Sequence, residues 1–296
     1  MFTAFAIPDV WRHQKHISGL TIIPRWAGSK TLRMSALPDV KALTFDVFGT
    51  VVDWRGSVTA ELFSRAAAKL ASGTLDPAAA QNLAAVGWAA FAQEWRDSYK
   101  HFTAGHDPAV SAWKDIDAHH RDSLVALLAA HELEGVYTAS EAQELSLAWH
   151  RLRPWEDSAP GLKRLGAGFV TSTLSNGNRS LLEDLDAFGN LGFRRILSAE
   201  DWKAYKPSSV VYDGAVRELL GEGGPEKRAQ VAMVAAHLGD LAAARTRGLR
   251  TVYVERRDEE DWEREGEKWR EARTWVDVWV AEGEGGFEEV ARRLGV

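Results

Sequence analysis

One short stretch around residue 46 constrains the fold more than any other part of the chain. The apolar run Ala42–Phe45 is typical of a buried strand, and it leads directly into Asp46 and then Gly49. A glycine lets the backbone turn tightly after such a strand. In open α/β sheets, ligands bind beyond the carboxyl ends of the strands, which is where Asp46 would lie. An Asp before a Gly is also a common turn former, so this stretch alone favours neither a site nor a plain turn.

Later stretches repeat the pattern of a buried strand followed by polar side chains. We predict strands at Gly168–Leu174 and Gln230–Ala236, each followed by a helix, and this alternation is typical of a parallel sheet. The polar residues that follow these strands, or lie on a loop between them, are Ser175, Asn176, Lys206, His237 and Asp240. Because the carboxyl ends of parallel strands meet at one edge of a sheet, we expect these side chains to converge with Asp46 on one crevice.

The expected domain boundaries follow from the stretches that lack a strand pattern. Residues 57–152 contain no convincing strand, so we expect an all-helical cap there, inserted into an α/β core made of residues 39–56 and 153–296. Residues 1–38 show no periodic core pattern, and we expect a disordered or loosely attached extension. The charged run 255–273 is most simply a solvated loop and helix.

Two features of the expected cap bear on function. A long helix opening at Asp76-Pro77 carries aromatic residues at spacings of three and four: Trp88, Phe91, Trp95, Tyr99 and Phe102. Arg96 lies at the edge of this stripe, where either an ordinary surface arginine with a buried stem or a functional arginine would fit. His119 and His120 point about 100° apart on a helix, so we expect solvated histidines and not a metal pair.

Four stretches together resemble the haloacid dehalogenase superfamily, and within it the 2-haloacid dehalogenases. They are Asp46-Val-Phe-Gly-Thr50, Thr173-Leu-Ser-Asn-Gly177, Tyr205-Lys-Pro207 and Ala235-Ala-His-Leu-Gly-Asp240. The resemblance runs from about Val40 to about Arg256, which is most of the chain. It implies a doubly wound, mostly parallel, Rossmann-like α/β sheet with an inserted all-helical cap.

The resemblance implies a covalent role for Asp46. In that family the matching Asp is the nucleophile, and Lys206 matches the lysine that pairs with it. Thr50 and Ser175 match hydroxyls that orient this carboxylate or bind the carboxylate of the substrate. The implied substrate is a short 2-haloacid, which becomes a 2-hydroxy acid through an aspartyl ester. A carboxylate suits this role because its usual pKa is about 3.9, so it is ionised at neutral pH without a base.

The resemblance also implies which residues meet the substrate, the departing halide and the hydrolytic water. The residues expected beside the substrate or the halide are Arg96, Trp95, Asn176 and Phe48. Trp95-Arg96 matches a Trp-Arg pair whose arginine accepts the halide, and a cation there would stabilise the developing negative charge. Asp240 matches the acid that holds the lysine and positions the water. His237 stands where many relatives have Asn, and it either polarises that water or orients Asp240.

Two other functions fit parts of the pattern. Phosphatases of the superfamily need an acid two residues after the nucleophile and an acidic magnesium ligand at the fourth strand end. This chain has Phe48 and Ala236 at those positions. A non-catalytic relative that binds small acids would have no need of Asp46. The sequence therefore favours a dehalogenase that uses no metal and no cofactor.

Composition narrows the partners and the compartment. A net charge of −6 gives no case for nucleic acid, and the absence of cysteine excludes disulfides, thiolate metal sites and a Cys nucleophile. No apolar run approaches the roughly 18 residues of a membrane span, so we expect a cytoplasmic enzyme without a membrane partner. The basic start leaves a mitochondrial location open, if residues 1–33 are a transit peptide, and a start at Met34 is equally compatible. A homodimer also remains open.

Overall fold

The computed structural model describes residues 35–107 and 109–296. We expected a disordered extension at residues 1–38, and residues 1–34 of it lie outside the described residues. The last residues of that extension pack on the core. Leu37 is buried, and Ala36 N donates a hydrogen bond to Arg293 O over 3.1 Å. None of the described helices is both long and apolar enough to cross a membrane.

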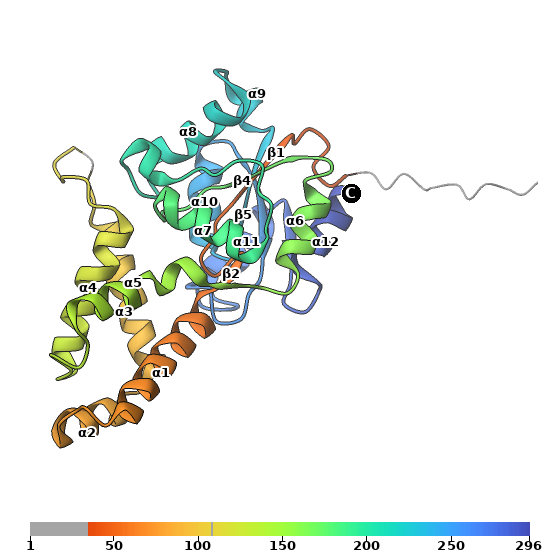
Figure 1. Ribbon diagram of the computed structural model, residues 1–296. Helices are drawn as coiled ribbons and strands as arrows, with labels where there is room; N and C mark the ends of the chain where they lie inside the picture. Colours follow the sequence, from red (N-terminus) through yellow and green to blue (C-terminus); the bar gives the residue numbers. More distant parts are fainter. Residues whose placement is uncertain (1–34, 108) are drawn as a thin grey trace, which may run out of the picture. The chain divides into compact units, whose positions relative to one another are not determined.

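A parallel sheet with the strand order β4-β1-β5-β6-β7 forms the centre of the described chain (Figure 1). Its strands are β1 (Ala42–Phe45), β4 (Val170–Thr173), β5 (Val231–Ala235), β6 (Arg250–Val254) and β7 (Val278–Val280). Phe45 lies level with Thr173 on one side and with Val234 on the other. The chain therefore leaves β1, β4 and β5 at neighbouring points of one sheet edge.

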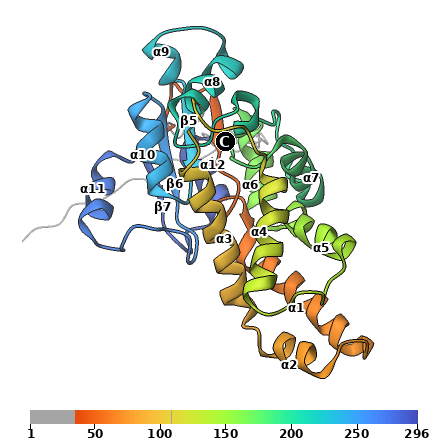
Figure 2. The same ribbon diagram turned by 90° about the vertical axis from the view of Figure 1, so that its left-hand side faces the viewer.

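Helices cover both faces of the sheet, and both faces are apolar, as a doubly wound fold requires. The helices on the face of Leu43 and Phe45 are α6 (Ser158–Leu165), α7 (Arg179–Gly189) and α12 (Gly286–Leu294). The helices on the face of Met233 and Tyr253 are α8 (Ser209–Leu220), α10 (Leu238–Thr246) and α11 (Glu267–Trp275). Figure 2 shows α10 and α11 on one side of the strands and α6 and α7 on the other. The predicted doubly wound α/β fold is confirmed.

The described residues between β2 (Val52–Asp53) and β3 (Arg153–Pro154) form only helices, and these two short strands pair antiparallel at the base. We call residues 54–151 the helical insertion. Its elements are α1 (Trp54–Ser72), α2 (Pro77–Ala85), α3 (Trp88–Ala104), α4 (Ile116–Ala130), α5 (Ala139–Ser146) and the 3-10 helix η1 (Leu147–Arg151). The other described elements are the 3-10 helix η2 (Ala199–Trp202) and α9 (Pro225–Arg228).

The long helix predicted from Asp76 is interrupted. Asp76 Oδ1 accepts from two backbone N–H groups at the start of α2, as its place before Pro77 predicts. The backbone becomes extended at Val86, and Gly87 then precedes α3. The aromatic stripe thus belongs to α3 alone, whose buried face lies against α4 and α1.

His119 and His120 are not solvated, contrary to expectation, because α4 turns both rings into an aromatic cluster. The two residues are only 8% and 1% exposed. His119 stacks on Phe102 with ring centroids 4.4 Å apart, and His120 stacks on Trp149 at 4.5 Å. Burial lowers the pKa of His119 to about 4 and holds the pKa of His120 well below its usual value.

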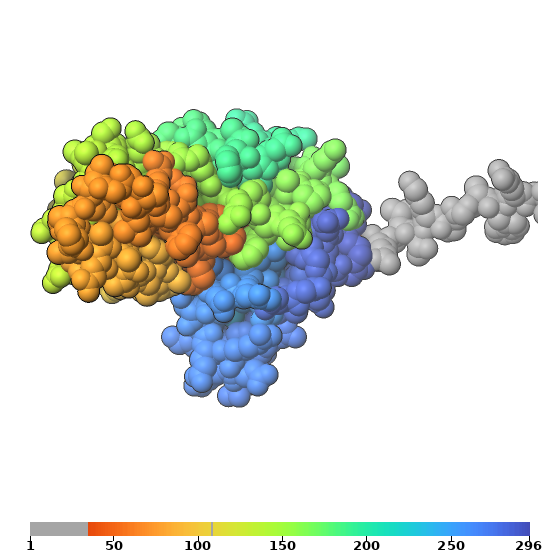
Figure 3. All heavy atoms as spheres, turned by 60° about the horizontal axis from the view of Figure 1, so that its bottom comes forward, coloured from red at the N-terminus to blue at the C-terminus, as the bar shows by residue number. Residues whose placement is uncertain are grey.

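The charged run 255–273 is only partly solvated, again contrary to expectation. Its first part contacts the helical insertion: Arg55 donates to Asp258 O over 3.0 Å, and Lys100 pairs with Asp261 at 2.7 Å. Figure 3 shows the orange surface of α1 next to the blue surface of the later chain. Between these contacts Glu259 turns inward and is only 5% exposed. One acid of the run is therefore part of the interior.

Candidate active site

The turn after β1 holds Asp46 against the neighbouring strand. Asp46 N donates to Val234 O over 3.0 Å, and the Asp46 side chain is buried. Gly49 has a φ of 82°, a left-handed backbone that glycine adopts without strain. A Cβ at Gly49 would also collide with the carboxylate of Glu259. Glycine at this position therefore permits both the turn and the close approach of a distant acid.

Lys206 lies between two carboxylates. Its Nζ is 3.0 Å from Asp46 Oδ1 and 2.5 Å from Asp240 Oδ2, and Tyr212 donates its hydroxyl to Asp240 Oδ1 over 2.6 Å. Burial alone would raise the pKa of Asp46, but Lys206, His237 and the other donors hold it well below its usual range. Burial alone would lower the pKa of Lys206, but Asp240 and Asp46 raise it. Both groups are therefore charged at neutral pH.

The second oxygen of Asp46 has donors of its own. Thr50 Oγ1 donates to Oδ2 over 2.7 Å, and this hydroxyl is oriented because Ala236 N donates to it over 2.9 Å. His237 Nδ1 lies 3.3 Å from the same Oδ2. The other ring nitrogen, Nε2, lies 3.4 Å from Glu259 Oε2. Oδ2 is thus more fully hydrogen-bonded than Oδ1.

The His237 ring lies between two acids and carries a shifted pKa. Burial would lower this pKa, but hydrogen bonds and charge from Asp46 and Glu259 raise it to about 10. The ring is therefore an imidazolium at neutral pH, with both nitrogens donating. The partners of the ring are Asp46 and Glu259 and not Asp240, which does not match the expectation that His237 orients Asp240. A role of His237 in polarising the hydrolytic water stays a prediction.

Asn176 and Ser175 follow β4, and their side chains bind backbone. Asn176 Oδ1 accepts from Lys206 N over 2.7 Å, and its Nδ2 donates to Lys206 O at 3.3 Å. The amide therefore fixes the loop that carries Lys206. Ser175 Oγ accepts from Gly177 N over 3.3 Å. Within the described residues, the hydrogen bonds of Asp46 come from Thr50, Lys206 and His237 and not from Ser175.

Arg96 of α3 lies in a cage of aromatic rings and lines the same cavity as Asp46. Its guanidinium carbon is 4.5 Å from the ring centroid of Tyr99, 5.4 Å from that of Trp54 and 5.5 Å from that of Phe48. The residue is 5% exposed. Its Nε has no hydrogen-bond partner in the described chain, and no described carboxylate pairs with the guanidinium. A buried cation without a counter-ion is costly, so this cage favours an anion.

A cavity of about 380 Å³ lies where these groups meet. It is lined by Asp46, Lys206, His237 and Asp240 from the core and by Arg96 and Tyr99 from α3. Trp95, which the sequence also placed at the site, is fully buried inside the helical insertion and donates from Nε1 to Ser123 Oγ over 3.0 Å. Its neighbour Arg96 alone of the Trp-Arg pair reaches the cavity.

Sequence reasoning missed some of the residues that complete this arrangement. Glu259 lies in a charged run where nothing local marks one acid as buried. Tyr212 is a lone tyrosine on a helix without a motif. Tyr99 belonged to the aromatic stripe that the sequence singled out, whereas Trp54 was not singled out, and the aromatic character of both was the available signal for a cage.

The polar groups of this cavity do not fit a magnesium ion. Among the described residues no group of three or more His, Asp or Glu side chains is arranged to hold a metal. The ion prefers several oxygen ligands, whereas Asp46 and Asp240 already share Lys206. Ala236, at the relevant strand end, offers no side-chain oxygen.

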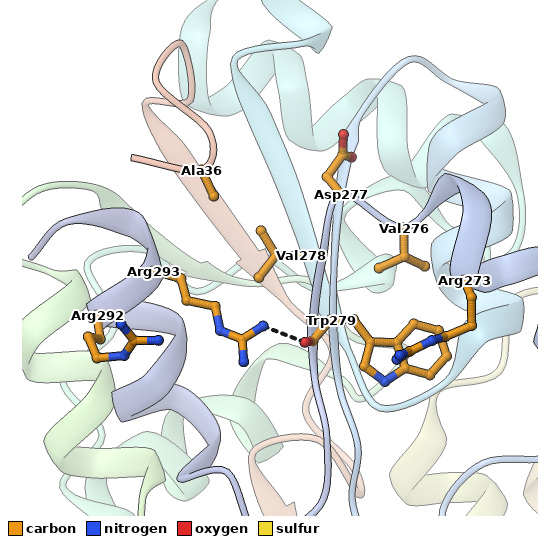
Figure 4. Close-up of a pocket in the computed structure, with 8 residues that line it drawn as sticks. All are labelled: Ala36, Arg273, Val276, Asp277, Val278, Trp279, Arg292 and Arg293. Atoms are coloured by element: carbon orange, nitrogen blue, oxygen red, sulfur yellow. Dashed lines mark hydrogen bonds between the residues drawn. The ribbon is translucent and has the colours of Figure 1, made fainter. Parts of the chain in front are cut away.

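Another hollow of about 630 Å³ lies at the β7 edge of the sheet (Figure 4). Its charged groups are engaged in structural contacts: Arg293 donates to Trp279 O over 2.6 Å, Arg273 lies 4.3 Å from the centroid of the Trp279 ring, and Asp277 accepts from Thr251 N. No residue lining it combines a nucleophile with an activating partner. The cavity at Asp46 is therefore the better candidate for chemistry.

Comparisons with known proteins show the family to which the chain belongs. The family model for haloacid dehalogenase-like hydrolases matches residues 40–248. An (S)-2-haloacid dehalogenase of Pseudomonas fluorescens is 30% identical over 119 residues, which is 39% of this chain and 50% of that protein. (S)-2-haloacid dehalogenase 1 of Pseudomonas sp. (strain CBS-3) is 32% identical over 112 residues, 37% of this chain and 47% of that protein. In these matches the chain spans about half the length of the curated relatives.

Solved structures match over more of their length. A defluorinating L-2-haloacid dehalogenase is 29% identical, with a TM-score of 0.70, and the match covers 89% of this chain and 99% of that one. Another L-2-haloacid dehalogenase is 30% identical, with a TM-score of 0.68, over 86% of this chain and 99% of that one. The chain therefore belongs to the haloacid dehalogenase-like hydrolases, and the two solved structures named here are those of L-2-haloacid dehalogenases.

Proposed function

We propose that this protein hydrolyses the carbon–halogen bond of short 2-haloalkanoic acids and releases 2-hydroxy acids through an ester on Asp46. One observation carries the proposal: Arg96 is a buried cation without a counter-ion, caged by aromatic rings, in the cavity of an ionised carboxylate. A halide leaves carbon as an anion and needs no proton. A cation in apolar surroundings is what such a leaving group requires.

In the first half-reaction, Asp46 Oδ1 attacks the carbon that bears the halogen. The C–O bond forms as the C–X bond breaks, and the bonding pair leaves with the halide toward Arg96. Oδ1 is the better nucleophile because it accepts from Lys206 alone, whereas Oδ2 already has Thr50 and His237. The depressed pKa of Asp46 keeps this carboxylate ionised.

In the second half-reaction, water attacks the ester carbon Cγ of Asp46. Asp240 takes a proton from the water, and Lys206 gives a proton to Oδ1 as the Cγ–Oδ1 bond breaks and the hydroxy acid leaves. Asp240 then returns its proton to Lys206 across their short contact. The carboxylic acid left at Asp46 loses its proton to solvent, which completes the balance.

The other site residues support this reaction indirectly. Asn176 positions Lys206 through its backbone, and Thr50 orients Asp46. The helical insertion acts as a cap, because it brings Arg96 and Tyr99 over the cavity and thereby excludes water from the first half-reaction. Ser175 and Trp95 are proposed to act through packing at the edges of the site.

The deciding experiment is halide release from 2-chloro, 2-bromo and fluoro acids, run beside a panel of phosphate monoesters. We expect halide from the acids, little phosphate with added magnesium, and no halide from Asp46→Asn. Phosphate release that depends on magnesium would instead identify a phosphatase. Binding of small acids without turnover would identify a non-catalytic relative.

A further inference from the structure

Glu259 has no role in the reaction as described above, yet it contacts a residue that contacts the nucleophile. Its Oε2 lies 3.4 Å from His237 Nε2, and His237 Nδ1 lies 3.3 Å from Asp46 Oδ2. We propose that Glu259 is a positioning residue for ester hydrolysis, an inference that rests on the proposed function. It holds His237 so that Nδ1–H, together with the Thr50 hydroxyl, donates to Oδ2 of Asp46 as that oxygen becomes negative.

The surroundings of Glu259 are built to deliver its carboxylate to this place. The side chain is 3% exposed, and Trp54 Nε1 donates to Oε2 over 3.0 Å. Gly49 leaves the space that the carboxylate fills, since a Cβ there would collide with it. A carboxylate brought inside at the cost of its hydration is expected to have a cationic partner, and among the described residues that partner is His237.

The charge on His237 depends on its acidic neighbours. The acids that face it are Asp46 at the end of β1 and Glu259 in the loop after β6, with Glu260 acting at longer range, while the cation Lys206 faces it across Asp46. When Asp46 is esterified it loses its charge. Of the two contacting carboxylates, only Glu259 then remains to keep the ring protonated. Glu259 therefore matters most in the second half-reaction.

The chemistry of that step defines what the donors do. Water adds to Cγ, and the electron pair of the Cγ–Oδ2 double bond moves onto Oδ2. The hydroxyl of Thr50 and the imidazolium N–H then stabilise this oxyanion without giving up their protons. When the intermediate collapses, the double bond reforms and the Cγ–Oδ1 bond breaks. The proton transfers remain those of Asp240 and Lys206.

The test is a rapid-quench experiment with a 2-haloacid that the wild type converts, in which halide and the protein-bound ester are both measured. In Glu259→Gln the shape is kept and the charge is lost. At about pH 6 its ester hydrolysis should be slowed much less than at alkaline pH, because the ring regains its proton as the pH falls below the ordinary histidine pKa of about 6.5. At about pH 9 its ester hydrolysis should slow by roughly 100-fold or more, since the ring is then neutral. A stoichiometric burst of halide and an accumulated ester should appear at that pH.

Two further variants separate positioning from general damage. Glu255→Gln removes another largely buried acid of the same segment, one that pairs with Arg264, and should behave as wild type. His237→Gln should slow ester hydrolysis at both pH values, and adding Glu259→Gln to it should cause no further loss. In a nitrogen-15 histidine titration of the resting enzyme, Glu259→Gln should lower the pKa of His237 from its value of about 10.

Each outcome has a distinct meaning. If the wild type turns over and Glu259→Gln hydrolyses its ester equally well at both pH values, only the role of Glu259 is overturned. An equal slowing at both pH values, with ester formation impaired too, would mean a merely structural role and would also overturn it. If the wild type forms no ester with any acid, the proposed function fails and this inference falls with it.

Discussion

Lys206 Nζ lies 3.0 Å from Asp46 Oδ1 although 160 residues separate the two along the chain. The same ammonium contacts Asp240 at 2.5 Å, so one cation lies between two carboxylates and offsets their repulsion. A divalent metal ion would have to displace it. This relationship ties the proposed nucleophile, its charge balance and the proposed general base of ester hydrolysis to a single side chain.

We therefore predict that halide release is unchanged after exhaustive chelation and dialysis. Lys206 already supplies the positive charge beside Asp46, and His237 is a poor ligand for a hard cation such as magnesium. The measurement is the initial rate of halide release before and after chelation, with and without added magnesium. If chelation abolishes the activity and magnesium restores it, the dehalogenase assignment is wrong.

Arg96→Lys should lower kcat more than it changes KM. Lysine keeps the charge but loses the planar fork that lies among three rings, so stabilisation of the departing halide should weaken. We expect kcat to fall on the order of 100-fold, as for loss of a group that acts mainly in the transition state. Arg55→Lys is a matched control, because Arg55 also lies over Trp54 at 4.6 Å but does not line the cavity. An unchanged kcat in Arg96→Lys would remove Arg96 from the reaction.

His150 joins the helical insertion to the core and should make this junction sensitive to pH. Its Nε2 lies 2.9 Å from Asp117 of α4, and its Nδ1 lies 2.7 Å from Asp184 of α7. Burial would lower the pKa of His150, but the two carboxylates outweigh it and raise the pKa. The folded-state pKa of His150 lies above its unfolded-state value. The two ion pairs therefore stabilise the folded protein fully below about pH 6.5, and this stabilisation is lost as the pH rises through the raised pKa.

The measurement is the free energy of unfolding of wild type and His150→Gln across this range of pH. At low pH the variant should be less stable on the order of 1 kcal/mol, a modest value because Asp184 is largely exposed. The difference should shrink at alkaline pH. His101→Gln, at an exposed histidine of α3, reports the general effect of such a substitution. A difference that stays constant with pH would show that the two ion pairs contribute nothing.

The sequence predicted the parts of the site that follow strands. Asp46 and Asp240 each come after a buried apolar run, and the geometry of parallel sheets brings such positions together. It could not predict Glu259, because the burial of this acid depends on Gly49 and Trp54, roughly 200 residues earlier in the chain. The burial of His119 and His120 likewise depends on tertiary contacts to Phe102 and Trp149 and not on helical periodicity.

The covalent role of Asp46 is tested most directly by a single turnover in water labelled with oxygen-18, with enzyme in excess over substrate. If water attacks Cγ of the ester, the first turnover should place the label in the Asp46 carboxylate, and the hydroxy acid should carry the unlabelled oxygen that was Oδ1. Mass spectrometry of the peptide that contains Asp46 measures this directly. Label found in the hydroxy acid after that first turnover, with none in Asp46, would contradict the ester mechanism.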